Sequence, residues 1–100
     1  MNGLFDLNGK VALVIGGHGG IGQAIAFGLA DAGADVVVAS RNLDALHSTT
    51  RDIESKGRKS LAVTVDIVDE EQVNRMVARI LETFPRIDIL VNAAGLAIRK

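Results

Sequence analysis

Apolar and polar residues alternate along this chain in two distinct patterns. Short, nearly unbroken apolar runs rich in β-branched residues occupy positions 11–15, 35–39, 61–65 and 87–91. Runs of this length, bounded by turn residues, are typical of strands buried on both faces, as in a parallel sheet. The pattern therefore predicts four strands.

Between these runs, apolar residues recur every three or four positions, which predicts three helices. The first follows a glycine-rich segment and ends at Gly33, and the second begins at the N-cap Asn42 and ends at Gly57. The third begins at Asp69, with Gln72 completing a capping-box pattern. The residues expected to face inward are Ile21, Ile25 and Leu29, then Leu43, Leu46 and Ile53, and finally Val73, Met76, Val77, Ile80, Leu81 and Phe84.

Strands that alternate with helices predict an α/β fold, in which right-handed crossovers place helices on both faces of a parallel sheet. The composition agrees with a globular domain: the chain has 100 residues, 48% of them hydrophobic, and a net charge of −1. The near-balanced charge argues against a nucleic-acid surface. Basic residues do gather between positions 51 and 59, but Asp52 and Glu54 lie among them, so we interpret this segment as a solvated helix end.

The chain contains no Cys, which excludes disulfides and thiolate metal sites. Its N-terminal residues lack the basic and apolar regions of a signal peptide. The apolar runs are far shorter than the ~20 residues needed to cross a bilayer. We therefore expect a cytoplasmic protein with neither a membrane nor a nucleic acid as partner.

A glycine-rich segment joins the first apolar run to the first helix. Gly16, Gly20 and Gly22 have the spacing G-x-x-x-G-x-G, and Gly17, Gly19 and Gly22 satisfy G-x-G-x-x-G. Between a parallel strand and a helix, unpaired backbone amides and the helix dipole favour a phosphate, and side chains would keep it away. A tight turn with a purely structural role is the alternative. The candidate contacts are Gly16, His18, Gly19, Gly20, Ile21 and Gly22.

A P-loop interpretation of this segment fails, because it would need Lys after Gly22, where Gln23 stands. His18 could donate to a phosphate or a ribose, or could be an exposed spacer. His47 has no partner pattern, and two isolated His residues do not form a metal site.

The residues after the second apolar run indicate which dinucleotide would bind. An acidic residue at this place favours NAD and repels a 2′-phosphate, but here the chain reads Ser40-Arg41. A guanidinium can pair with a phosphate through two parallel hydrogen bonds, and a hydroxyl can add another. The sequence therefore predicts NADP(H) over NAD(H). The missing acid also disfavours S-adenosylmethionine, because its unphosphorylated ribose would favour a carboxylate at this place. Alternatively, Arg41 is a surface residue at a helix start.

Polar and small residues also follow the third and fourth runs. Asp66, beside Ile67, could accept a hydrogen bond from the exocyclic amine of an adenine, or could instead cap the loop before Asp69. The small residues of Asn92-Ala93-Ala94-Gly95 would let backbone pass close to a cofactor, while Asn92 could tie adjacent strands together.

Together these stretches resemble the short-chain dehydrogenase/reductase family from about Leu7 onward. The segment from Ile15 to Gly22 is similar to its T-G-x-x-x-G-x-G motif, with Ile15 in place of Thr, and residues 92–95 are similar to N-N-A-G, with Ala93 in place of Asn. Asp66 matches the family's adenine-contacting Asp, and Ser40-Arg41 resembles its NADP-preferring members. The resemblance implies a Rossmann-type, doubly wound sheet of order 3-2-1-4 and an oxidoreductase that interconverts an alcohol and a ketone, usually as a dimer or tetramer.

The family's catalytic Tyr-x-x-x-Lys and its Ser follow the N-N-A-G motif, whereas this chain contains no Tyr. Residues 1–100 therefore resemble the N-terminal part of a single NAD(P)-binding domain, cut after strand four, with no catalytic residue present. Alone, this part is expected to be inactive and, with an open apolar edge strand, poorly soluble. The alternative is a non-catalytic NAD(P)-binding sensor or scaffold module.

The runs Ala39-Ser40-Arg41-Asn42-Leu43 and Ala97-Ile98-Arg99-Lys100 are similar to sugar-acid dehydrogenases of the gluconate 5-dehydrogenase type. The 3-oxoacyl carrier-protein reductases are also similar in this region. The resemblance thus implies a small alcohol or ketone substrate, a sugar acid or polyol among the candidates.

Overall fold

A computed structural model describes residues 6–16 and 20–94. Strands and helices alternate throughout this part, as the sequence predicts. The elements are, in chain order, β1 (Val11–Ile15), α1 (Gly20–Asp31), β2 (Asp35–Ser40), α2 (Leu43–Ser55), β3 (Ser60–Thr64), α3 (Glu70–Thr83) and β4 (Ile89–Asn92).

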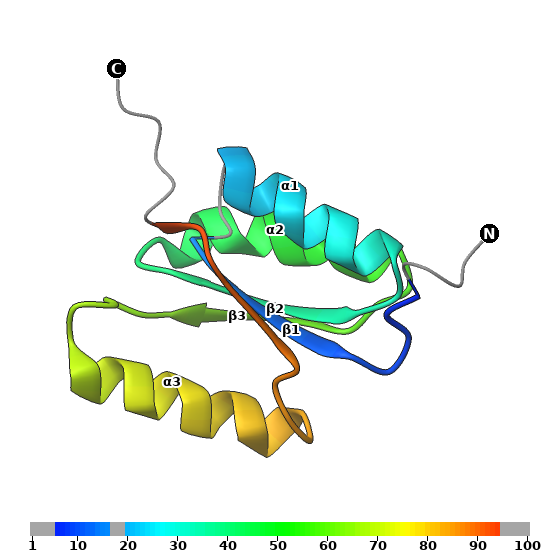
Figure 1. The fold of residues 1–100 in the computed structure, drawn as a ribbon. Helices are drawn as coiled ribbons and strands as arrows, with labels where there is room; N and C mark the ends of the chain where they lie inside the picture. Colours follow the sequence, from blue (N-terminus) through cyan, green and yellow to red (C-terminus); the bar gives the residue numbers. More distant parts are fainter. Residues whose placement is uncertain (1–5, 17–19, 95–100) are drawn as a thin grey trace.

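The described strands form one parallel sheet of order β3-β2-β1-β4. Helices α1 and α2 cover one face of the sheet and α3 covers the other (Figure 1). This doubly wound α/β arrangement confirms the predicted fold class and strand order. Because every strand runs the same way, all their carboxyl ends lie at one edge, which is where open α/β sheets bind ligands.

The core has two parts, one on each face of the sheet. Val11, Leu13 and Ile15 of β1 pack with α3, whereas Ala12 and Val14 pack with α1 and α2. All five are buried, since alternate side chains of a strand point to opposite faces and both faces are covered. This is why β1 reads as an unbroken apolar run in the sequence.

Three residues expected to face inward are exposed: Ile21, Leu43 and Leu81. In α1 the small residues Gly22, Ala26 and Ala30 are the buried ones, and Ile25 and Leu29 pack only partly against the core. Ile21 lies one position before the buried row and Leu81 one position after buried Ile80, so each is rotated away from the sheet. Leu43 is the first residue of α2, where the helix begins beyond the strand end.

The helix ends agree with the sequence. The side chain of Asn42 accepts a hydrogen bond from the amide of Ala45, and that of Asp69 accepts from the amides of Glu71 and Gln72. Gly33 has φ +111, and a Cβ there would lie 2.6 Å from the side-chain oxygen of Asn8, so this turn requires glycine. Within residues 6–16 and 20–94, we find no helix with the length and apolarity that a membrane crossing demands.

Strand β4 begins at Ile89, two residues later than predicted. The cause is Asp88, whose carboxylate accepts the amide of Val11 at 2.8 Å, while the Asp88 amide donates to the Val11 carbonyl at 2.8 Å. The Asp88 side chain thus accepts the hydrogen bond from the Val11 amide that a strand carbonyl would otherwise accept. Arg86 completes the clamp, donating from Nε to Asp88 at 2.9 Å and from Nη2 to the Gly9 carbonyl at 2.6 Å.

The clamp joins the amino ends of β1 and β4 across 77 residues of sequence. The hydrogen bond from the Val11 amide, aided by Arg86, lowers the pKa of Asp88 from its ordinary 3.8. A carboxylate whose pKa is lowered in the folded state stabilises that state fully above its unfolded-state pKa. This stabilisation is lost as the pH falls through the folded-state pKa.

We therefore expect Asp88→Asn to lower the urea midpoint of the full-length protein at neutral pH. The amide that replaces the carboxylate must turn its NH2 group toward either Val11 or Arg86, both of which are donors. The difference from the wild type should shrink as the pH falls below 3.8 and on through the lower folded-state pKa, because the wild-type carboxyl then becomes protonated in both states. Circular dichroism during urea titration measures both effects.

Asp52→Asn is the matched control, because Asp52 is exposed on α2 and its side chain bonds no other described residue. This control should leave the midpoint nearly unchanged. Equal midpoints for Asp88→Asn and the wild type at neutral pH would contradict the role of the clamp.

Candidate nucleotide-binding edge

The residues singled out by the sequence lie at the carboxyl ends of the strands. Gly16 follows β1, Ser40 ends β2, Asp66 lies two residues after β3 and Asn92 ends β4. The chain leaves β1 toward α1 on one face, whereas β4 is reached from α3 on the other face. The carboxyl ends of β1 and β4 therefore form the switch point at which such sheets bind nucleotides.

Gly16 lies where three strands meet. Its amide donates to the Ala39 carbonyl of β2 at 2.6 Å, and its φ is +86. A Cβ at this position would lie 2.8 Å from the amide nitrogen of Ala94, just after β4. Both the left-handed conformation and the contact require glycine. The alternative of a tight turn with a structural role therefore holds for Gly16, whether or not a ligand binds.

The first turn of α1 can accept an anion. Gly20 is its first residue, is exposed and would meet nothing within 4 Å if it carried a Cβ. The turn contains no acidic residue, so no carboxylate opposes a phosphate at the positive end of the helix. Gly22 is buried and Ile21 is exposed. His18 and Gly19, like Gly17, lie outside the described residues.

At the end of β2, Ser40 and Arg41 differ in environment. Ser40 is buried, and its hydroxyl accepts from the Asn42 amide at 3.0 Å and lies 3.4 Å from the Asn42 carbonyl, to which it donates. Arg41 is exposed and forms no hydrogen bond or ion pair with any other residue in the described part of the chain. Its guanidinium is thus available to a ligand, while the serine hydroxyl already supports the turn.

At the end of β3, Asp66 supports its own loop. Its Oδ1 accepts from the Val68 amide at 3.2 Å, and its carbonyl accepts from the Asp69 amide at 3.0 Å. The loop-capping alternative therefore holds for this residue, although Oδ2 has no partner among the described residues. Ile67, next in the chain, is 40% exposed.

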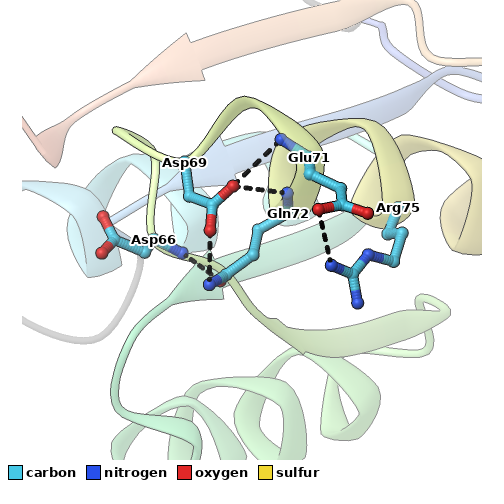
Figure 2. Close-up of polar contacts among 5 residues, drawn as sticks. All are labelled: Asp66, Asp69, Glu71, Gln72 and Arg75. Atoms are coloured by element: carbon cyan, nitrogen blue, oxygen red, sulfur yellow. Dashed lines mark hydrogen bonds and ion pairs between the residues drawn. The ribbon is translucent and has the colours of Figure 1, made fainter.

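The predicted capping box of α3 is wrong in one half. The side chain of Gln72 reaches the amide of Asp66, with Oε1 2.9 Å from that nitrogen, rather than the amide of the N-cap Asp69 (Figure 2). The reason is that the Asp69 amide is already bonded to the Asp66 carbonyl. Gln72 Nε2 donates to Asp69 Oδ2 at 3.2 Å.

At the end of β4, the side chain of Asn92 makes no bond to a neighbouring strand in the described part of the chain. Its Oδ1 accepts from the Ala94 amide at 3.2 Å, within its own turn. The link to β1 is made by backbone, since the Ala93 amide donates to the Ile15 carbonyl at 2.8 Å. Ala93 is buried and Ala94 exposed, and Gly95 lies outside the described residues.

One contact near the edge had no signal in the sequence. Gln23, in the first turns of α1, donates from Nε2 to Oγ1 of Thr49 at 3.1 Å, and Thr49 is fully buried in α2. The two residues are 26 positions apart on different helices, so no periodicity could pair them. In the described ranges, no cluster of His, Cys, Asp and Glu could hold a metal ion.

The short-chain dehydrogenase family model matches residues 10–100 of the sequence. The chain therefore belongs to this family, as its motifs indicate. It is 44% identical over 99 residues to a short-chain dehydrogenase, anuF, of Penicillium roqueforti, covering 94% of this chain and 36% of that protein. It is 42% identical over 96 residues to gluconate 5-dehydrogenase of Gluconobacter oxydans, covering 96% and 38%.

The crystal structure of L-sorbose reductase from Gluconobacter frateurii, complexed with NADPH and L-sorbose, superimposes with a TM-score of 0.82. The sequences are 38% identical, and the match covers 90% of this chain and 34% of that one. The chain thus spans little more than a third of the length of its relatives. It corresponds to their N-terminal portion.

We expect Gly16→Ala to destabilise the full-length protein by about 2 kcal/mol or more, because the new methyl group meets the Ala94 backbone and φ is positive. Gly28→Ala is the control, since Gly28 lies inside α1 and a Cβ there would meet nothing within 4 Å. It should be stabilising by about 0.5–1 kcal/mol. Urea unfolding curves compare the two, and an undiminished midpoint in Gly16→Ala would refute the steric requirement.

Proposed function

We propose that this chain is the NADP(H)-binding, N-terminal part of a short-chain oxidoreductase that interconverts an alcohol and a ketone by hydride transfer. Arg41 carries the proposal, because it immediately follows β2, is exposed and has no partner among the described residues. In this architecture an acid after the second strand suits NAD, and a basic residue suits the 2′-phosphate of NADP.

In the proposed complex the diphosphate lies at the N-terminus of α1. Backbone amides of the glycine-rich segment after Gly16, whose own amide is already bonded to Ala39, donate to it; His18 adds a further donor, and the helix dipole favours its charge. The absence of acid in the first turn of α1 and the close backbone junction at Gly16 support this placement.

Arg41 binds the 2′-phosphate through its guanidinium. Ser40 contributes in two ways. Its bond from the Asn42 amide holds the turn that carries Arg41, and its hydroxyl proton, now donated over 3.4 Å to the Asn42 carbonyl, can turn to a phosphate oxygen instead.

The adenine lies at the end of β3. Asp66 accepts a hydrogen bond from the exocyclic amine, for which its Oδ2 is available, and the exposed side chain of Ile67 supplies apolar surface for the ring. Asn92, Ala93, Ala94 and Gly95 form the inner wall along the cofactor. The small side chains there leave room for a ligand beside β1.

The residues of this chain bind and orient the cofactor, and the bound cofactor supplies the hydride. Reduction of a ketone also needs a proton donor beside the carbonyl. The chain contains no Tyr, the family's usual donor, so we assign proton transfer to residues beyond these 100. Relatives named as dehydrogenases of gluconate and of 2-dehydro-3-deoxy-D-gluconate support a sugar acid or polyol as substrate. A homo-oligomer is proposed by analogy with the family.

A non-catalytic NAD(P)-binding module is the second candidate, since every residue assigned above serves binding alone. We expect the full-length protein to oxidise NADPH in the presence of a keto sugar acid, with Ser and Tyr-x-x-x-Lys following Gly95. Absorbance of NADPH during turnover measures this activity. Tight NADPH binding without turnover on a panel of ketones, together with a missing Tyr-x-x-x-Lys, would favour the module.

We expect Arg41→Ala to weaken NADPH binding by about 1.5–3 kcal/mol, which is roughly ten- to a hundredfold, because a charge-assisted bond to the 2′-phosphate is lost. NADH binding should change little. Titration of the full-length protein, followed by NADPH fluorescence, gives both constants. Arg51→Ala, an exposed arginine on α2, serves as the control for net charge. Tighter binding of NADH than of NADPH by the wild type would overturn the cofactor assignment.

A further inference from the structure

We propose that Gln72 is a positioning residue for recognition of the adenine ring, acting through Asp66. The inference rests on the proposed NADP(H)-binding function and deepens it. Gln72 lies in the first turn of α3 and touches no atom assigned to the ligand. Its side chain instead fixes the backbone of the residue that would read the base.

The two ends of the Gln72 amide face partners of opposite kind (Figure 2). Oε1 accepts from the Asp66 amide at 2.9 Å, and Nε2 donates to Asp69 Oδ2 at 3.2 Å. A backbone amide can only donate and a carboxylate can only accept, so the orientation of the glutamine amide is determined by its partners. Neither an apolar side chain nor a glutamate could satisfy both.

Asp69 is itself fixed at the start of α3. Its Oδ1 accepts from the amides of Glu71 and Gln72 at 3.0 and 3.3 Å, which leaves Oδ2 to hold the glutamine side chain. The chain of contacts therefore runs from the N-terminus of a helix, through two side chains, to the Asp66 amide. A regular helix is a rigid support compared with a loop.

These contacts hold Asp66 from three directions. Its amide is bonded by Gln72, its carbonyl by the Asp69 amide and its Oδ1 by the Val68 amide. In Figure 2 the Asp66 carboxylate extends away from Gln72 and Asp69. Oδ2 has no partner among the described residues and is the atom left to accept from a base.

The chemistry of the base gives a direct readout of this carboxylate. Adenine presents an exocyclic amine, which donates to a carboxylate. Hypoxanthine presents a carbonyl at the same position, which accepts and is repelled. The ratio of the dissociation constants for the hypoxanthine analogue of NADPH and for NADPH therefore reports where Asp66 is held, separately from overall stability or phosphate binding.

The test compares this ratio in the full-length protein for the wild type, Gln72→Met, Asp66→Asn and Glu71→Gln, by fluorescence titration. Gln72→Met keeps side-chain length but neither hydrogen bond, so the ratio should fall about three- to tenfold toward one. Asp66→Asn should abolish or reverse the preference, because its amide can donate to the hypoxanthine carbonyl.

Glu71→Gln is the matched control. It removes an exposed ion pair to Arg75 on the same turns of α3, keeps the Glu71 amide and does not touch Asp66, so the wild-type ratio should persist (Figure 2). Should Gln72→Met fail to fold, Gln72→Asn replaces it. This side chain keeps the amide but is one methylene too short to reach both partners, and the same fall is expected.

The possible failures can be told apart. A wild-type protein that does not bind NADPH refutes the proposed function itself. A wild type that binds NADPH but does not distinguish the two bases refutes the role of Asp66, and with it this inference. A wild type that prefers adenine, with an unchanged ratio in the folded Gln72 variant, overturns the role of Gln72 alone, whatever happens to the melting temperature.

Discussion

The contact between the Gly16 backbone and Ala94 is the constraint on which this edge of the molecule depends. Gly16 extends the pairing of β1 with β2 by one bond, to Ala39, while its Cα faces the backbone that continues β4. A side chain there would collide with the backbone of Ala93 and Ala94. The end of β1 and the backbone at residues 93–94 are therefore positioned against each other by one glycine.

Strand β4 is held at both ends by backbone groups of β1. At the amino end, the Asp88 side chain replaces a strand carbonyl as the acceptor for Val11. At the carboxyl end, the Ala93 amide donates to Ile15, next to the Gly16 contact. In between, four residues pair in register, from Ala12 with Ile89 to Ile15 with Asn92. Because β4 is short and at the edge of the described sheet, its position depends on these terminal contacts more than a central strand's would.

The sequence predicts the fold well, because the information is local and repeated. Buried strands are apolar throughout, and caps such as Asn42 and Asp69 bond to their own helices. The expectation that Ile21 and Leu81 face inward is wrong, because a shift of one position on a helix rotates a side chain by about 100°. In α1 the approach to the sheet is made by Gly22, Ala26 and Ala30, whose small size allows close packing.

The sequence predicts which residue types lie at the candidate site, but not the hydrogen bonds that their side chains form. Ser40, Asp66 and Asn92 each accept the amide two residues ahead, so these polar side chains build the turns at three strand ends as well as serving as candidate contacts. A sequence motif cannot separate the two roles, since both require the same residue type at the same place. The spacing of Gln72 from Asp69 predicts a capping box. The Asp69 amide is already bonded to the Asp66 carbonyl, so the Gln72 side chain accepts from the Asp66 amide instead.

The distribution of charge explains why cofactor choice would depend so heavily on Arg41. Lys10, Lys59 and Arg86 precede strands, at the edge opposite the candidate site, and Arg51, Arg75 and Arg79 lie within helices. Among the described residues, Arg41 is the only lysine or arginine that directly follows a strand. The end of β3 is acidic instead, with Asp66, Asp69, Glu70 and Glu71 close in sequence. With acidic groups after the neighbouring strand β3, a bound 2′-phosphate would depend on the guanidinium of Arg41 for its local positive charge.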